Sequence, residues 1–187
     1  MRLFIALRPP KKERTRIYRA IQVLREKDYP VHWIDLENFH LTMKFLGNIG
    51  VEQVKLIEAA MSKVASQTRA FSINLAGLGA FPSIRYPRLI WLGIVASADL
   101  RGLKQDLEWA LADCGFLSET REFHPHITLG RASQSDGAGS FRGLDDLVAE
   151  LDYRSEIKVG EIDLIHSHLS KNGPPYSVIS SKTLSAA

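Results

Sequence analysis

Hydrophobic residues recur along this chain with two periods, and each period predicts a different kind of element. Alternating apolar and polar residues, or a short continuous apolar run, are typical of a strand. Apolar residues three and four positions apart are typical of a helix with one buried face. The segments with strand character are 3–7, 31–34, 40–47, 71–75, 88–95, 124–131, 156–169 and 176–184. The segments with helical spacing are 11–28, 51–66, 98–111 and 144–151.

Turn-forming residues separate these elements. We expect a loop at 77–82, a flexible polar stretch at 133–140 and a turn at 171–175. Strands and helices alternate, and the same order recurs in each half of the chain. This pattern predicts an α+β fold of two similar lobes with mostly antiparallel sheets and the helices outside. At 187 residues the chain fits a single domain, 1–187, that contains both interleaved lobes.

Composition indicates the cellular compartment and the charge of the partners. The single cysteine, Cys114, leaves no internal disulfide and no cysteine metal cluster, as in proteins of the reducing cytoplasm. The first apolar run is too short for a signal peptide, and no stretch has the roughly 20 apolar residues of a membrane span. We therefore expect a cytoplasmic monomer with no membrane partner. The net charge of +3 and the pI near 9.0 favour anionic partners weakly.

The sequence His-x-Thr occurs twice, each time within a segment of strand character. His40 and Thr42 form the first pair, and His126 and Thr128 form the second. Residues i and i+2 of a strand share a face, so each histidine projects with its threonine. The neighbouring positions are predicted to face the core: Leu41, Met43 and Phe45 in the first segment, Ile127 and Leu129 in the second. Two such strands side by side would surround a small anion with two imidazoles and two hydroxyls.

Two cations lie close to these motifs. Lys44 has the phase of His40 and Thr42 and is predicted to reach the cleft. Arg131 has the opposite phase to His126, and it joins the site only if the strand ends or bulges at Gly130. For both cations the alternative is an ordinary solvated charge at a strand end.

Two histidines on facing strands suit phosphodiester chemistry. Cleavage needs a base for the attacking oxygen and an acid for the leaving oxygen, and histidine can serve as either near neutral pH. Hydroxyls and a cation can stabilise the phosphoryl oxygens as charge develops. This chemistry requires no metal and no cofactor.

Other interpretations of the histidines have less support. The motif residues could be half-exposed positions on a solvated sheet face. A metal site is the main chemical rival, because His124 and His126 share a face, as do His166 and His168. However, no carboxylate lies within the motif strands to complete a ligand set. Cys114 follows an amphipathic helix, a position that fits a core thiol better than a nucleophile.

The motifs His40-Leu41-Thr42-Met43-Lys44-Phe45-Leu46-Gly47 and His126-Ile127-Thr128-Leu129-Gly130-Arg131 resemble the two signatures of the 2H phosphoesterase superfamily. More closely, the chain resembles the RNA 2′,3′-cyclic phosphodiesterases once named 2′-5′ RNA ligases. The likeness extends to 2–7, 33–47, 77–82, 87–93 and 173–176. Met43 and Gly130 depart slightly from the family pattern, which more often has leucine and alanine there.

The resemblance implies a bilobal fold with pseudo-twofold symmetry and a positively charged cleft between antiparallel sheets. It also implies hydrolysis of an RNA 2′,3′-cyclic phosphate to a 2′-phosphomonoester without metal or cofactor. His40 would be the proton donor and His126 the proton acceptor, while Thr42, Thr128 and Arg131 would bind phosphoryl oxygens. Substrates would be cyclic-phosphate RNA ends, such as tRNA fragments, or small cyclic nucleotides. Two alternatives stay open: joining of RNA ends through a 2′-5′ linkage, and RNA-end binding without catalysis.

Overall fold

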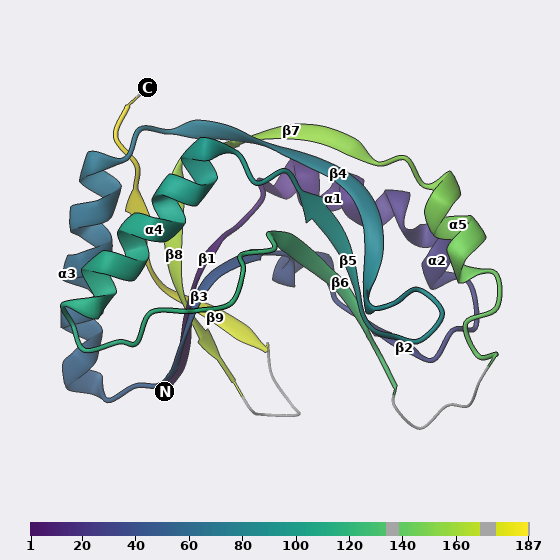
Figure 1. Cartoon of the computed structure of the whole chain (residues 1–187), viewed down its shortest axis with the longest axis horizontal. Coiled ribbons are helices and arrows are strands. Elements are labelled where there is room, and N and C mark those ends of the chain that lie inside the picture. The colour runs from purple at the N-terminus through teal and green to yellow at the C-terminus, as the bar shows by residue number, and fades with distance from the viewer. Residues whose placement is uncertain (134–138, 169–174, 187) are drawn as a thin grey trace.

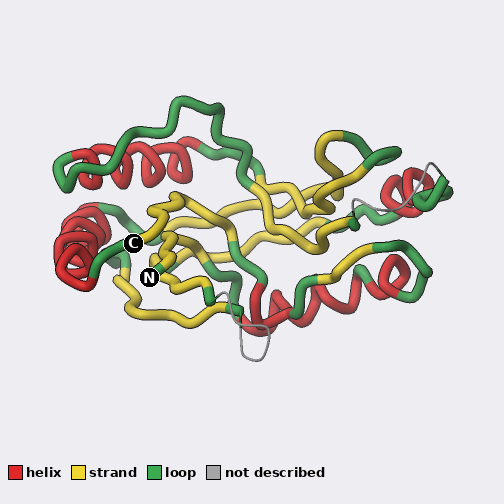
Figure 2. The backbone as a smooth tube through the Cα atoms, turned by 90° about the horizontal axis from the view of Figure 1, so that it is seen from below, coloured by secondary structure: helices red, strands yellow, loops and turns green. Residues whose placement is uncertain are grey.

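Strands and helices alternate along the chain in the computed structural model, which describes residues 1–133, 139–168 and 175–186. The strands are β1 (Arg2–Leu7), β2 (Val31–Trp33), β3 (Leu41–Asn48), β4 (Phe71–Pro82), β5 (Pro87–Ile94), β6 (His126–Ala132), β7 (Arg154–Val159), β8 (Glu161–Ser167) and β9 (Tyr176–Thr183). The helices are α1 (Lys11–Ala20), α2 (Gln22–Arg25), α3 (Val51–Gln67), α4 (Ala98–Ala112) and α5 (Leu144–Glu150), with a 3₁₀ turn at Leu36–Asn38. The strands run through the middle of the molecule, and the helices lie around them (Figures 1 and 2).

The named strands form one antiparallel sheet with the order β7-β4-β5-β6-β3-β1-β8-β9, and β2 pairs with β6. The order divides the sheet into two halves of four strands. The halves meet between β3 and β6, where Leu41 pairs with Ile127. This pair is the middle residue of each His-x-Thr motif. The pairing of the two halves therefore brings both motifs to the centre of the sheet.

The helices bury the apolar faces that their spacing predicts. α4 begins after Ser97, whose hydroxyl accepts a hydrogen bond from the Leu100 backbone N–H. Its buried leucines are Leu100, Leu103, Leu107 and Leu111. α4 packs against β3 and α3, and α3 packs against β8 and β9 (Figure 1, left). Each buried leucine contributes about 1.5–3 kcal/mol, so these helices hold the β3-β1-β8-β9 half of the sheet in place.

Three predicted elements differ from the structure. The helix expected at 11–28 is interrupted at Ile21, which separates α1 from α2. The loop expected at 77–82 is instead the second half of β4, because this segment pairs with β5 up to Pro82. The strand expected at 156–169 is two strands separated by Gly160, since β7 pairs with β4 in one half and β8 pairs with β1 in the other.

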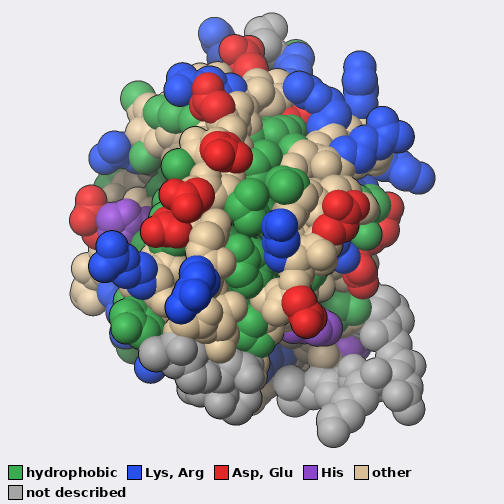
Figure 3. All heavy atoms as spheres, turned by 90° about the vertical axis from the view of Figure 1, so that its right-hand side faces the viewer, with side chains coloured by type: hydrophobic (Ala, Val, Ile, Leu, Met, Phe, Trp, Pro, Cys, Tyr) green, Lys and Arg blue, Asp and Glu red, His purple; other side chains and the backbone are tan. Residues whose placement is uncertain are grey.

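The α+β class and the antiparallel sheet are confirmed. The polar stretch 133–140 and the turn 171–175 lie largely outside the described residues. Figure 3 shows one end of the molecule, where basic and acidic side chains are interspersed over the same face. At the upper right of this view, however, basic side chains gather without acidic ones between them. Among the described residues no helix is both long enough and apolar enough to cross a bilayer.

Candidate active site

A bulge follows each His-x-Thr motif and decides which side chains face the site. In β3, Thr42 pairs with Ala6 and Lys44 pairs with Ile5, so Met43 is the extra residue. In β6, Thr128 pairs with Trp91 and Gly130 pairs with Ile90, so Leu129 is the extra residue. An extra residue reverses the in-and-out alternation of the residues beyond it. In β3 this reversal applies to Lys44 and Phe45, because a second register shift follows at Leu46. In both strands the alternation reverses at the residue directly after the threonine of the motif, Met43 in β3 and Leu129 in β6.

The first bulge corrects two predictions about β3. Phe45 was expected to face the core, but 70% of its surface is exposed and it lines the pocket between the two motifs. Lys44 was expected to reach the cleft, but it is buried with 2% exposure on the other side of the strand. Its ammonium donates to Glu108 Oε2 at 2.6 Å and to the Leu117 carbonyl at 2.8 Å. Lys44 is thus part of the ion-pair network with α4, and we withdraw it from the candidate site.

The second bulge has the opposite consequence for Arg131. Past Leu129 the phase changes, and Arg131 lines the same pocket as His126 and Thr128. The condition stated from the sequence, a bulge near Gly130, is met one residue earlier. Phe45 and Arg131 therefore occupy equivalent positions after their motifs, one aromatic and one cationic.

The pocket between the two motifs has a volume of about 620 Å³ and brings together most of the predicted site residues. His40, Thr42, His126, Thr128 and Arg131 all line it. Arg2 also lines it, and the described part of its wall contains no carboxylate. A cavity of this size can hold a nucleotide, and its charge favours an anion.

Both histidines are oriented by a backbone carbonyl. His40 Nδ1 lies 2.7 Å from the Asn38 carbonyl oxygen, and His126 Nδ1 lies 2.7 Å from the His124 carbonyl oxygen. A carbonyl oxygen only accepts, so Nδ1 of each ring carries the hydrogen. Nε2 is then the nitrogen that can exchange a proton with a bound group. His124 thus orients His126 through its carbonyl. Its exposed side chain lies 3.5 Å from Glu122 and lines an adjoining pocket that shares Thr42, Phe45 and His126 with the site.

Aromatic rings pack around each imidazole. The rings of Phe4 and Tyr176 lie 4.9 and 5.2 Å from the His40 ring, between centroids. Phe81 and Trp91 lie 5.6 and 6.4 Å from the His126 ring. Each imidazole is therefore flanked by two aromatic rings.

Burial lowers the pKa of His40 to about 4. The backbone carbonyl at Asn38 opposes this shift, while the nearby charges of Arg131 and Arg8 add to it. His40 is therefore neutral at pH 7 in the free protein, because an imidazolium among aromatic rings and cations loses its hydration without gaining a counter-ion. An anion bound beside the ring would supply that counter-ion.

The sequence missed several residues of this site. Phe45 was assigned to the core because the bulge at Met43 depends on the partner strand. Tyr176 packs edge-on to His40. The only sign of this residue in the sequence was that it lies in the segment 173–176, which resembles the family. The Asn38 and His124 carbonyls had no sequence signal, since any residue supplies a backbone carbonyl.

Within the described residues, no group of three or more His, Cys, Asp or Glu side chains is arranged to hold a metal ion.

Two His-x-Thr strands that meet at one cationic pocket in an antiparallel sheet define the class of two-histidine phosphoesterases. Residues 9–171 match the family model described as the 2′-5′ RNA ligase superfamily, and the chain belongs to this 2H phosphoesterase superfamily.

Relatives and solved structures agree with this membership. The RNA 2′,3′-cyclic phosphodiesterase of Methanothermobacter thermautotrophicus is 30% identical over 179 residues, which are 95% of each chain. The protein of the same name from Aeropyrum pernix is 32% identical over 170 residues, 88% of this chain and 92% of the relative. The crystal structure of E. coli LigT complexed with 3′-AMP has a TM-score of 0.75 at 25% identity, and it covers 98% of this chain and 97% of that one.

Proposed function

We propose that this protein hydrolyses the 2′,3′-cyclic phosphate at an RNA end to a 2′-phosphomonoester. The observation that carries the proposal is the pairing of two imidazoles, each with Nε2 available, in one cationic pocket with two threonine hydroxyls. The relatives named RNA 2′,3′-cyclic phosphodiesterase support the choice of substrate.

In the proposed reaction, His126 Nε2 removes a proton from water as the water oxygen bonds to phosphorus. The bond between phosphorus and the 3′ oxygen breaks, and His40 Nε2 donates a proton to that oxygen. Thr42, Thr128 and Arg131 hold the phosphoryl oxygens while negative charge develops on them. Because His40 is neutral in the free protein, we propose that it gains its proton once the phosphate anion lies beside it.

The test uses an oligonucleotide that ends in a 2′,3′-cyclic phosphate, incubated in excess EDTA. The expected product is the 2′-phosphomonoester. His40→Ala and His126→Ala should each lower kcat at least about a hundredfold, the usual contribution of a positioned acid or base. His32→Ala is the matched control, because His32 is exposed on β2 and does not line the pocket. Near-normal turnover in either motif variant, or a product that is joined to an added 5′-hydroxyl RNA instead of hydrolysed, would refute the proposal.

A sulfur substitution separates the two histidine roles. A 3′-thiolate leaves without protonation, so a substrate with sulfur at the 3′ position no longer needs the acid. His40→Ala should then recover most of its lost activity on the sulfur substrate, while His126→Ala should remain inactive on both substrates. The reverse pattern of rescue would exchange the two roles. Circular dichroism of each variant checks that the fold is retained.

A further inference from the structure

A second cavity lies behind the central strand pair, on the side opposite the active-site pocket. We call it the back cavity. Its volume is about 430 Å³, and none of its lining residues lines the active-site pocket. Leu41 and Ile127 reach into it, whereas their neighbours in the His-x-Thr motifs face the other way. The two cavities are therefore separated by the β3–β6 pair.

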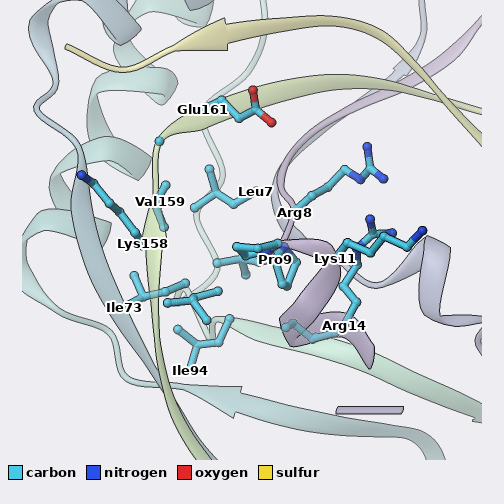
Figure 4. A pocket seen from close by; sticks show the side chains of 15 residues that line it. Leu7, Arg8, Pro9, Lys11, Arg14, Ile73, Ile94, Lys158, Val159 and Glu161 are labelled. Carbon is cyan, nitrogen blue, oxygen red and sulfur yellow. The ribbon is translucent and has the colours of Figure 1, made fainter. Parts of the chain in front are cut away.

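One wall of the back cavity is aliphatic. It consists of side chains from six strands of both sheet halves: Leu7, Leu41, Ile73, Ile94, Ile127, Ile157 and Val159. Figure 4 shows Leu7, Ile73, Ile94 and Val159 together on one side of the cavity. Branched aliphatic side chains gain free energy when hydrocarbon replaces water beside them. This wall suits an alkyl chain better than a sugar or a second phosphate.

The other side of the back cavity is cationic. Arg8, Lys11 and Arg14 project together there (Figure 4). The lining also contains Lys158 and one carboxylate, Glu161, so four cations face one anion. Arg14 is only 7% exposed, and its Nε is buried without a hydrogen-bond partner in the described structure. The other end of its guanidinium is engaged, since NH1 donates to Glu37 Oε2 at 2.5 Å. No ion pair within the described residues involves Arg8 or Lys11.

The start of α1 adds to this positive end. The helix begins at Lys11 after Pro10, and no side chain caps it. The first backbone N–H groups of an uncapped helix and its dipole favour an anion at this position. The buried, unpartnered Nε of Arg14 points independently to the same kind of ligand.

We propose that the back cavity binds an amphiphilic anion, a short alkyl chain that carries a carboxylate or phosphate head group. The alkyl chain lies along the aliphatic wall, and the head group binds at Arg8, Lys11 and Arg14. The cavity volume falls within the range of small-molecule sites. This site is separate from the proposed hydrolase activity, and its test does not depend on that activity.

The test is isothermal titration calorimetry with octyl phosphate and octanoate. Each titration is run both without and with a saturating nucleoside 2′-monophosphate, which competes for the active-site pocket. At least one octyl anion should bind in a 1:1 ratio, and the tighter of the two identifies the head group. Octanol and inorganic phosphate, which each supply half of the ligand, should bind at least about tenfold more weakly. Absence of binding by both octyl anions, or their displacement by the nucleotide, would overturn the proposal.

Two neighbouring lysines provide a matched pair of variants. Lys11→Glu should weaken binding about tenfold or more, because Lys11 lines the cavity. Lys12→Glu makes the same charge change on the same turn outside the lining, and it should weaken binding less than about threefold. Ile157→Trp should abolish binding by filling the aliphatic side. Equal weakening by the two lysine variants would indicate general attraction of anions and would refute the site.

Discussion

Glu108→Gln tests the buried ion pairs that hold α4 against β3. Glu108 accepts from Lys44 and from Lys104, each at 2.6 Å, and all three residues are at most 8% exposed. Lys104 would keep the Glu119 carboxylate and the Met43 carbonyl, both at 2.6 Å. Lys44 would keep the Leu117 carbonyl but would have no carboxylate beside it among the described residues. The substitution therefore leaves one ammonium buried without a counter-ion.

Removing one partner of a buried ion pair costs about 3–5 kcal/mol, because the remaining charge stays desolvated. We expect a loss of that size in the free energy of unfolding, measured by urea denaturation at pH 7 with an unchanged m-value. Glu119→Gln is the control. The Glu119 side chain is 41% exposed, so this substitution should cost about 1 kcal/mol or less.

Two further measurements sharpen this prediction. Adding Lys44→Met to Glu108→Gln removes the stranded charge and should restore about 2 kcal/mol. Burial acts to raise the pKa of Glu108, but hydrogen bonds from Lys104 and Lys44 more than offset it and hold the pKa below its ordinary 4.5. As the pH falls, the unfolded chain therefore binds the proton before the folded chain does. The difference in the free energy of unfolding between wild type and Glu108→Gln should shrink below about pH 4.5. If Glu108→Gln costs no more than Glu119→Gln, the network does not stabilise the fold as described.

Three other perturbations follow from the site. The pKa of His40 falls from 6.5 to about 4 on folding, so the unfolded chain binds the proton first as the pH falls. The free energy of unfolding should therefore decrease by about 3 kcal/mol from pH 6.5 to 4, and urea denaturation of His40→Asn should lack this pH dependence. In Gly79→Ala the new Cβ would lie 2.3 Å from the Trp91 ring, so we expect a loss of about 1–3 kcal/mol by thermal unfolding, whereas Gly102→Ala, with open space, should be neutral or stabilising. Arg131→Gln should lower kcat/KM for the cyclic phosphate about 10- to 100-fold without changing the melting temperature, and an unchanged kcat/KM would remove Arg131 from the site.

The residues closest to the chemistry were predictable because they obey a local rule. His40 and Thr42 share a face, as do His126 and Thr128, since alternation within one strand needs no knowledge of its neighbours. Helical spacing likewise predicted the buried leucines of α4. Local backbone geometry decides both patterns.

The bulges and the cavities depend on contacts between distant segments. The extra residue at Met43 exists only in relation to β1, and the one at Leu129 only in relation to β5. They turn Arg131 into the pocket and Lys44 away from it, although the strand period alone predicted the reverse for each. Similarly, 77–82 appeared to be a loop because its glycines have no apolar period, yet Gly79 leaves the space that the Trp91 ring fills.

The sequence by itself thus determined the fold class, the amphipathic helices and the two His-x-Thr pairs. The tertiary structure decided the phase beyond each motif, the neutral state of His40 and the existence of a second cavity behind the site. The physical reason is the range of the interactions. Side-chain alternation is set within a few residues, whereas register, burial and cavity shape are set by strands that are far apart in the chain.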